Sequence, residues 1–344
     1  MRINILADKM PWFGKHQCYE RVADYIKQIN QDTQIYCTRD TIINKIFGKL
    51  YSIKKGWHSR HDFARAAAEF KFSVETSKNA EISHILFFDL HYYYLHKWKK
   101  APKNIIGTIH HPVNRVIGPP YKKYLQRLSS AIILYRRGVP RFEKIIGRER
   151  VKYIPYGVDT DFFYQSKEPN NRKDIIFTGI NGRNIEMLFR VIKKLGKTNQ
   201  ELKFHLVVPK KYRYPLKKLA NLQNIIWHDN LLEEELRDLY QNSSLMLLPM
   251  NQSGVNTAVV EAMACGLPVV TTDVGGIRDY GGGSIYPVVK NNDDDAMVEL
   301  VEKYLADEKY RNSIAKKERQ FAEDKLAWPI VAKRHLKVYE GLMK

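Results

Sequence analysis

Short apolar runs alternate with amphipathic stretches along the chain, and this alternation limits the possible fold more than any other feature. In the first half the runs predict strands at Ile3–Ala7, Gln34–Cys37, His84–Phe88, Asn104–Ile109 and Ala131–Tyr135. In the second half they predict strands at Asp174–Thr178, Lys203–Val208, Asn224–Trp227, Leu245–Leu248 and Pro268–Thr271. Between them, stretches such as Glu233–Asn242 and Val255–Cys265 predict helices. Such alternation favours parallel sheets covered on both faces, so we expect an α/β protein with Rossmann-like, doubly wound sheets.

The length of 344 residues is too great for one ordinary core and fits two domains. Residues 165–173 are polar, contain Pro169 and lack apolar residues, as interdomain linkers do. We therefore predict an N-terminal domain over residues 1–165 and a C-terminal domain over residues 166–325. The last segment, from about Asp293 to Met343, is predicted to be helical with a break at Pro329.

Composition narrows the class of protein. An apolar content of 44% with 12% aromatic residues is typical of a folded globular chain. The three cysteines are scattered and suggest neither a disulfide framework nor a zinc site, which favours a reducing compartment. No apolar run reaches the roughly eighteen residues that a membrane-spanning helix needs. We therefore expect a cytoplasmic protein.

The positive charge is large and uneven. The formal net charge is +20, and residues 97–152 hold fifteen Lys and Arg but only Glu143 and Glu149 as acids. Such a segment attracts phosphates, whether of nucleic acid, of anionic lipid or of a polyprenyl phosphate. The alternative is a solvated basic face that serves solubility alone.

An aromatic run lies beside this basic segment and favours a lipid surface. Tyr and Trp prefer the headgroup level of a bilayer, and Lys and Arg prefer anionic lipid. Readers of single-stranded nucleic acid also mix basic and stacking side chains, but no nucleic-acid module signature is found in the chain. We expect an anionic membrane surface as partner and no nucleic acid, with a patch made of Tyr92, Lys97, Trp98, Lys99, Lys100, Arg136 and Arg137.

The stretch from Leu247 to Tyr280 carries the clearest chemical signal. An apolar strand ends at Pro249, a polar loop follows, and a helix begins near Val255 or Asn256. Ligands of doubly wound domains bind at this edge of the sheet, and a helix N-terminus there suits a diphosphate. Glu261, one turn into the helix, suits ribose hydroxyls, and Gly275–Gly276 offers a second close backbone approach. The alternative is a plain strand–loop–helix unit with an exposed glutamate.

This stretch resembles the donor-binding signature of the family-4 retaining glycosyltransferases, which have the GT-B fold. The family pattern has two glutamates eight positions apart, followed by Ala-Met-Ala-x-Gly-x-Pro-Val-Val and a Gly-Gly turn. Here Glu261 is the second glutamate, residues 262–270 complete the pattern, and Ser253 stands where the first glutamate is expected. Family members contact the ring of the donor sugar through that first glutamate, so the serine puts this contact, and with it the identity of the sugar, in doubt. The resemblance implies donor contacts from Ser253, Gly254, Asn256, Thr257, Ala258 and Glu261.

Further segments resemble the same family over most of the chain. Residues 154–159 resemble its segment before the interdomain linker, and Trp328–Leu342 resembles its last helix, which crosses back to the first domain. Gly179 and Arg183 match the loop that opens the donor domain, where a basic residue faces the donor phosphates. The accompanying lysine is not evident, and Lys210 or Lys211 could substitute for it. Gly14 is retained from the glycine-rich loop near the N-terminus.

Histidines and acidic pairs complete the candidate site. His110 and His111 follow a predicted strand, and His110 better matches a family histidine that contacts the donor sugar, although either of them could simply cap the strand. His16 and His91 are weaker candidates. The pair Asp159 and Asp161 has the Asp-x-Asp form of a metal site but fits the interdomain segment better, so we expect no metal.

The resemblance implies a hexosyltransferase that moves a sugar from a nucleoside diphosphate sugar with retention of configuration. Arg183 and His110 are the predicted catalytic residues, and the donor is more readily a UDP-sugar than a GDP-sugar. No cofactor is expected. We expect a glycan or lipid-linked acceptor, on the inner face of a bacterial membrane, for surface polysaccharide synthesis. The alternatives are an epimerase or phosphorylase of this fold and an inactive sugar-nucleotide-binding subunit.

Overall fold

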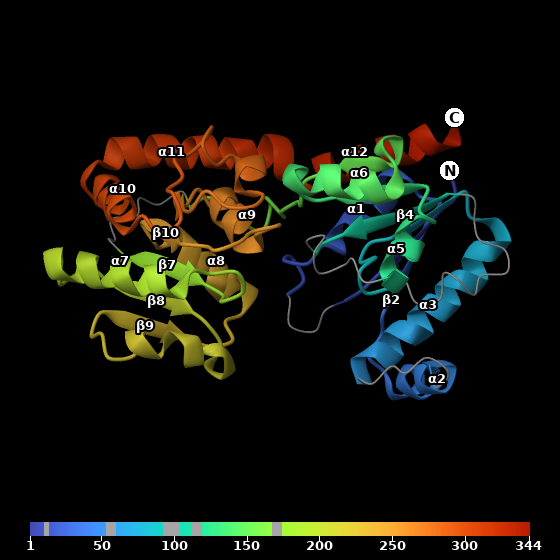
Figure 1. Cartoon of the computed structure of the whole chain (residues 1–344), viewed down its shortest axis with the longest axis horizontal. Coiled ribbons are helices and arrows are strands. Elements are labelled where there is room, and N and C mark those ends of the chain that lie inside the picture. The colour runs from blue at the N-terminus through green and yellow to red at the C-terminus, as the bar shows by residue number, and fades with distance from the viewer. Residues whose placement is uncertain (10–13, 53–59, 92–103, 112–118, 167–173) are drawn as a thin grey trace. The chain divides into compact units, whose positions relative to one another are not determined.

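The computed structural model describes residues 1–9, 14–52, 60–91, 104–111, 119–166 and 174–344 (Figure 1). The predicted patch residues Tyr92, Lys97, Trp98, Lys99 and Lys100 lie outside these ranges, as does most of the predicted linker. The chain divides into two compact units. The first unit comprises Met1–Phe13, Gln17–Tyr156 and Trp328–Lys344, and the second comprises Gly14–His16 and Gly157–Ala327. Residues 157–165 thus lie in the second unit, whereas the sequence places them before the boundary.

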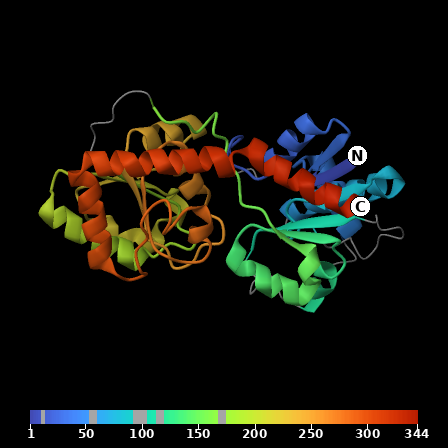
Figure 2. The ribbon, with the colours of Figure 1, turned by 90° about the horizontal axis from the view of Figure 1, so that it is seen from above.

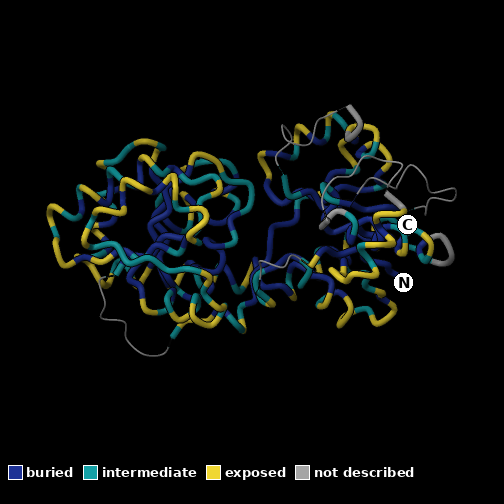
Figure 3. Tube along the Cα trace, turned by 90° about the horizontal axis from the view of Figure 1, so that it is seen from below, coloured by how far each residue is buried: buried dark blue, intermediate teal, exposed yellow. Residues whose placement is uncertain are grey.

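A parallel sheet forms the core of the first unit. Its strands are β1 (Ile3–Ala7), β2 (Thr33–Cys37), β3 (Ile82–Ile85), β4 (Ile105–Ile109), β5 (Ser130–Ile133) and β6 (Val151–Tyr153). Among the described residues their order is β2-β1-β3-β4-β5-β6, and every pair is parallel. All five residues of β1 are buried, because helices cover both faces of the sheet. Figure 3 shows buried segments, in dark blue, in the interior of this unit.

The helices of the first unit follow its strands. They are α1 (Arg21–Ile29), α2 (Ile42–Ser52), α3 (Arg60–Asn79), α5 (Pro119–Leu125), α6 (Val139–Ile146) and α12 (Trp328–Met343). Although α12 is the last helix of the chain, it packs on α1 near the start (Figure 2). The predicted break at Pro329 falls in the first turn of α12, where proline is tolerated because the backbone N–H has no partner within the helix.

The second unit holds a second parallel sheet. Its strands are β7 (Ile175–Thr178), β8 (Phe204–Val207), β9 (Ile225–His228), β10 (Leu245–Leu248) and β11 (Val269–Thr271), in the order β11-β10-β7-β8-β9. Its α-helices are α7 (Ile185–Thr198), α8 (Glu233–Gln241), α9 (Thr257–Ala264), α10 (Asp294–Ala306) and α11 (Glu308–Phe321). A π-helical turn, Ala322–Leu326, ends this unit.

The predicted bounds of the strand His84–Phe88 are wrong, because β3 begins and ends earlier in the chain. β3 ends at Ile85, and residues 86–90 form a turn that closes with hydrogen bonds from the amides of Leu90 and His91 to the carbonyl of Phe87. The turn places the carboxylate of Asp89 beside the end of β4, where it accepts hydrogen bonds from backbone amides. The short edge strand β6 was not predicted, because Lys152 interrupts its apolar pattern.

Among the described helices, none is both long enough and apolar enough to cross a lipid bilayer.

Candidate functional site

The strand order of the second sheet defines where a ligand can bind. The chain runs from β7 outward through β8 to β9, and then returns to place β10 on the other side of β7. The loops after β7 and β10 therefore diverge at the same edge, and ligands of open α/β sheets bind at such a switch point. The predicted donor residues Gly179, Arg183, Ser253, Gly254 and Asn256 lie in these two loops or at the end of one of them.

Backbone hydrogen bonds join the two loops. The amide of Asn184 donates to the carbonyl of Pro249 at 2.9 Å, and the amide of Asn251 donates to the carbonyl of Gly182 at 2.9 Å. Gly182 has a φ of +73°, and a Cβ there would lie 2.6 Å from the carbonyl oxygen of Gln252. Only glycine meets both conditions, so the loops approach each other closely because of this residue.

A third loop, which follows β11, joins the same group. The amide of Gly276 donates to the carbonyl of Ser253 at 2.8 Å. Gly275 has a φ of +58°, and a Cβ at this position would lie 1.7 Å from the Ser253 oxygen. The predicted close approach at Gly275–Gly276 is therefore made to the backbone of Ser253.

Arg183 lies between the first two loops. Its guanidinium donates to the carbonyls of Thr178 at 3.0 Å and Asn181 at 3.2 Å, and to Oδ1 of Asn256 at 3.4 Å. Gly179 leaves room for it, since a Cβ there would lie 3.4 Å from Nη2. Burial lowers the pKa of Arg183 to about 10, so the side chain remains cationic at neutral pH. No carboxylate forms an ion pair with it within the described part of the chain.

The N-terminus of α9 adds a second positive feature. Asn256 precedes the helix, but its side chain caps no backbone amide. Instead its Oδ1 accepts from Arg183, and its Nδ2 contacts the sulfur of Met250 at 2.9 Å. The positive end of the helix dipole and the guanidinium thus lie beside the same asparagine, next to Thr257 and the buried Ala258, an arrangement that suits an anion.

Glu261 lies inside the second unit. It is 4% exposed, and its Oε2 accepts a hydrogen bond from the hydroxyl of Tyr240 at 3.1 Å. The alternative reading, an exposed glutamate, is therefore wrong. Burial, with the Glu261 carboxylate nearby, raises the pKa of Tyr240 well above its usual value, so Tyr240 remains a donor.

Lys210 and Lys211 lie in a short 3-10 helix directly after β8. Both are exposed, and β8 adjoins β7, so they lie at the same edge of the sheet as Arg183. The backbone amide of Lys210 donates to Asp229 at 3.0 Å, and the ammonium of Lys211 lies 4.9 Å from the centre of the Tyr212 ring.

Residues 14–16 belong to the second unit and cradle a carboxylate there. The amides of Lys15 and His16 donate to Glu233 at 2.6 and 2.7 Å, and a Cβ on Gly14 would lie 1.9 Å from the Glu233 carboxyl carbon. His16 also hydrogen-bonds Asp159 at 2.7 Å. Among the described residues, no three His, Cys, Asp or Glu side chains gather as metal ligands, and this includes the Asp159–Asp161 pair.

In the first unit, Asp89 organises the two predicted histidines. Its carboxylate accepts from the backbone amides of His110 and His111, and it also contacts Nδ1 of His111. Burial opposes ionisation of Asp89, but its interactions with the two histidines, led by the hydrogen bond from His111, outweigh it and hold the pKa below its usual value. The two histidines therefore share a fixed anionic support.

His110 is half-buried and packs among aromatic rings. It stacks on Phe87 with 4.6 Å between ring centres and meets Tyr19 edge-on at 4.8 Å. Burial lowers its pKa, so the ring is neutral, and Nε2 donates to the carbonyl of Leu86 at 2.9 Å. The other nitrogen, Nδ1, is then an acceptor. His111 is more exposed, with 43% of its side chain accessible.

A directional chain of hydrogen bonds supports His110 from behind. Nδ1 of His335 donates to the carbonyl of Val331 at 2.9 Å, so its Nε2 must accept, at 3.0 Å, from the hydroxyl of Tyr19. Thr108 also interacts with Tyr19 and partly offsets the burial that raises the pKa of the Tyr19 hydroxyl. The chain continues with a hydrogen bond of 2.8 Å from Nε2 of His84 to Thr108.

This series of hydrogen bonds starts and ends on α12, to which both His335 and Tyr339 belong. Tyr339 donates to Nδ1 of His84 at 2.5 Å. Burial lowers the pKa of His335 to about 4 and that of His84 well below its usual value, which keeps both rings neutral. Every link then has one donor and one acceptor. The chain fixes α12 to the strands that carry His110, a support that sequence patterns cannot reveal.

Arg136 and Arg137, the two described members of the predicted patch, lie after β5 in a short 3-10 helix. Both are exposed, and the guanidinium of Arg136 lies 4.2 Å from the centre of the Tyr153 ring.

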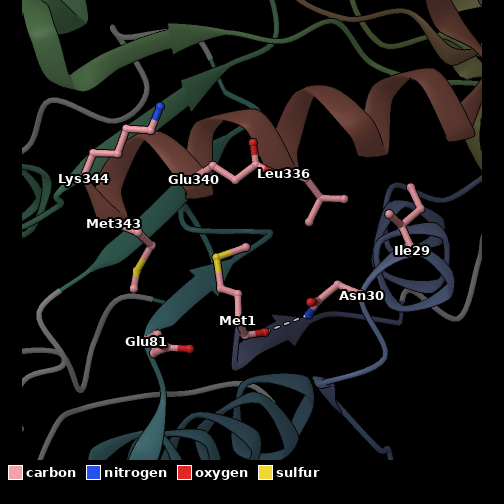
Figure 4. A pocket seen from close by; sticks show the side chains of 8 residues that line it. All are labelled: Met1, Ile29, Asn30, Glu81, Leu336, Glu340, Met343 and Lys344. Carbon is pink, nitrogen blue, oxygen red and sulfur yellow. Dashed lines mark hydrogen bonds between the residues drawn. The ribbon is translucent and has the colours of Figure 1, made fainter.

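Two pockets lie at the opposite edges of the sheets. One, of about 580 Å³, is lined by residues that include Met1 and Glu81, which precede β1 and β3, and by Leu336 and Glu340 of α12 (Figure 4). The other, of about 540 Å³, includes Ser244 and Pro268, which precede β10 and β11. Both are at the N-terminal ends of strands, away from the edge where ligands of this fold bind.

Comparison with known families agrees with the geometry. Residues 159–321, which fall within the second unit, match the family Glycosyl transferases group 1. This match covers most of the second unit and no residue of the first.

Two of the proteins to which this chain is similar have names that state an activity. MMP alpha-(1->4)-mannosyltransferase of Mycolicibacterium hassiacum is 22% identical over 268 residues, which cover 69% of this chain and 65% of the relative. The match thus spans a little under two thirds of that relative's length. N,N'-diacetylbacillosaminyl-diphospho-undecaprenol alpha-1,3-N-acetylgalactosaminyltransferase of Campylobacter jejuni is 32% identical over 117 residues, or 32% of this chain and 29% of the relative.

Solved structures establish the fold as GT-B. Sucrose-phosphate synthase of Thermosynechococcus elongatus superposes with a TM-score of 0.77 at 14% identity, covering 99% of each chain. HepE of Anabaena, solved in complex with UDP, superposes with a TM-score of 0.74 at 12% identity, covering 99% of this chain and 100% of HepE.

We predict that Gly275→Ala destabilises the second unit. The substitution adds a Cβ that would clash with the Ser253 carbonyl, at a φ that disfavours alanine, so it should lower the free energy of unfolding by about 2 kcal/mol or more. Gly341→Ala is the matched control, because a Cβ there has no neighbour within 4 Å. Equal melting temperatures for the two variants would show that the three loops do not pack as described.

We also predict that acid weakens the first unit through His335. A histidine with a pKa of about 4 when folded and about 6.5 when unfolded stabilises fully above pH 6.5 and loses this contribution as pH falls toward 4. The loss is about 2 kcal/mol at about pH 5. In His335→Gln, where an amide oxygen can accept from Tyr19, the melting temperature should fall less between neutral pH and pH 5 than in the wild type. An identical fall in both proteins would contradict the neutral chain.

Proposed function

We propose that this protein is a retaining glycosyltransferase, and that the switch point of its second unit binds the diphosphate of a nucleoside diphosphate sugar. The observation that carries this proposal is Arg183, a half-buried cation beside the N-terminus of α9 with no carboxylate partner among the described residues. The match to the family Glycosyl transferases group 1 and the GT-B fold support it. A diphosphate supplies the negative charge for which this site is suited.

The proposed chemistry is the stabilisation of a leaving diphosphate. As the bond between the sugar and the diphosphate breaks, negative charge grows on the departing oxygen, and preorganised donors lower the barrier most effectively there. Arg183 and the first amides of α9 would supply these donors, with Lys210 or Lys211 as an additional cation from the neighbouring loop. We assign the charge stabilisation to these protein groups, and we assign no protein nucleophile.

The sugar and the ribose are assigned to other residues. Glu261 would accept hydrogen bonds from the ribose hydroxyls, with Tyr240 holding its carboxylate. Neutral His110 would accept, through Nδ1, from a hydroxyl of the donor sugar or of the acceptor. Ser253 and Gly254 would line the sugar, with Ser253 unable to make the contact of the glutamate that the family pattern has there. Gly14, Gly179, Thr257 and Ala258 would provide close backbone approach to the donor.

The proposed donor is a UDP-sugar, and the proposed acceptor is a glycan or a lipid-linked glycan. UDP is supported by the complex of HepE, and a lipid-linked acceptor is supported by the name of the Campylobacter relative. The basic segment at residues 97–152 also suits a phosphate-bearing acceptor on an anionic membrane, where this protein would act in polysaccharide synthesis at the inner face.

The function is tested with purified protein and a panel of UDP-, GDP-, ADP- and TDP-sugars, following binding by calorimetry and sugar release by chromatography. We expect one donor class to bind and to be turned over slowly even without acceptor. Binding without turnover, also in the presence of glycan acceptors, would favour the inactive binding subunit that Ser253 suggests. Failure of every sugar nucleotide to bind would contradict the proposed function.

We predict that Arg183→Gln lowers turnover of the preferred donor about 100- to 1,000-fold, because it removes one charged donor from the leaving group. Arg190→Gln is the control, since Arg190 is an exposed arginine of the same unit that pairs with Asp294. Steady-state rates of both variants, with melting temperatures to confirm folding, decide the result. A wild-type rate in Arg183→Gln would exclude Arg183 from the proposed role.

A further inference from the structure

Within the part of the chain that the structure describes, helix α2 of the first unit packs on α3 through one face. A Cβ added to Gly48 would lie 1.7 Å from the carbonyl oxygen of Phe63, which belongs to α3, so the two helix backbones approach closely at this glycine. Phe47 reaches the edge of the same contact, with 5.3 Å between its ring centre and that of Phe70. Figure 1 shows α2 alongside α3 at the border of this unit.

The other face of α2 is apolar and exposed. Ile42 is 77% exposed, Ile43 78%, Ile46 58% and Leu50 67%. At about 100° per residue, these side chains and Phe47 cover an arc of about 140°, and Gly48 lies roughly opposite its centre. A water-facing helix normally carries polar side chains on this side, so the arc requires a partner.

The charges beside this arc are positive. Lys49 and Lys45 lie along the edge next to Ile42, and Lys45 pairs with Asp40 at 2.7 Å. In the sequence, Lys and Arg also continue beyond the helix, and no Asp or Glu occurs between Asp40 and Asp62. An apolar stripe with a basic border and no acids is the composition of helices that lie in the interface of an anionic bilayer.

We propose that α2 docks in the plane of an anionic membrane, with Ile42, Ile43, Ile46 and Leu50 at the boundary between headgroups and acyl chains. This surface was not singled out in the sequence, where the membrane partner was assigned to the patch that includes Arg136 and Arg137. The inference deepens the proposed function at a membrane. The biological role of docking rests on that proposed function. The docking itself is measured without any sugar donor.

Sedimentation with vesicles tests the proposal. Full-length protein is mixed with vesicles of phosphatidylcholine and phosphatidylglycerol, or of phosphatidylcholine alone. We expect binding to the anionic vesicles, and at least about tenfold weaker binding for the double variant Ile43→Ser, Leu50→Ser, because two large apolar side chains no longer enter the bilayer. Ile29→Ser is the matched control, since Ile29 is a 48% exposed isoleucine on α1 of the same unit.

Melting temperatures, sugar release and analytical ultracentrifugation distinguish the proposal from its alternatives. Melting temperatures and sugar release without acceptor should be unchanged in the double variant, so loss of docking is separable from loss of the proposed activity. Wild-type vesicle binding by the double variant would overturn the proposal, even if Arg136→Ser, Arg137→Ser reduced binding. It would equally be overturned if analytical ultracentrifugation found a dimer of the wild type that the double variant cannot form, since a second copy would then cover α2.

Discussion

The contacts of one guanidinium organise the second unit's ligand edge. Arg183 is cationic and half-buried, yet its hydrogen bonds go to main-chain carbonyls and to the neutral Asn256, and no ion pair forms with it in the ranges that the structure describes. Burial of a cation without a counter-charge costs free energy, which the carbonyl dipoles only partly offset. The position is therefore best explained by an anionic ligand.

Two glycines hold the loops that make this position possible. Gly182 lets the loop after β7 contact the loop after β10, and Gly275 lets the loop after β11 contact Ser253. The sheet order brings all three loops to one edge. In the first unit, hydrogen bonds of side chains hold the strands and α12 around His110. They are made by Asp89 and by the series that includes Tyr19 and His84.

Strands such as β1, β4, β7 and β10 were predictable from the sequence because they are buried along their whole length and so form continuous apolar runs. The predicted start of α9 was within two residues, since a polar loop and Asn256 mark it. The end of β3 was mispredicted because Leu86, Phe87 and Phe88 are apolar but form a turn.

The arrangement of the candidate site depends on contacts between distant segments and could not be derived from local patterns. The burial of Glu261 against Tyr240 and the close approach of Gly275 to the backbone of Ser253 both arise from tertiary packing. The exposed face of α2 was hidden in the sequence, because an amphipathic helix has the same pattern whether its apolar side faces a core or a membrane. The resemblance to a family named the residue types at the donor site, and the structure adds their partners.

The central claim is that Arg183 is kept without a counter-charge for an anionic ligand, and Asn256→Asp tests it most directly. The variant places a carboxylate where Oδ1 of Asn256 now lies 3.4 Å from the guanidinium, and aspartate is also a good residue before a helix. Calorimetry should show nucleoside diphosphate binding weakened at least about tenfold, with a melting temperature equal to or above that of the wild type. Undiminished affinity for the nucleoside diphosphate in a folded Asn256→Asp protein would contradict the account.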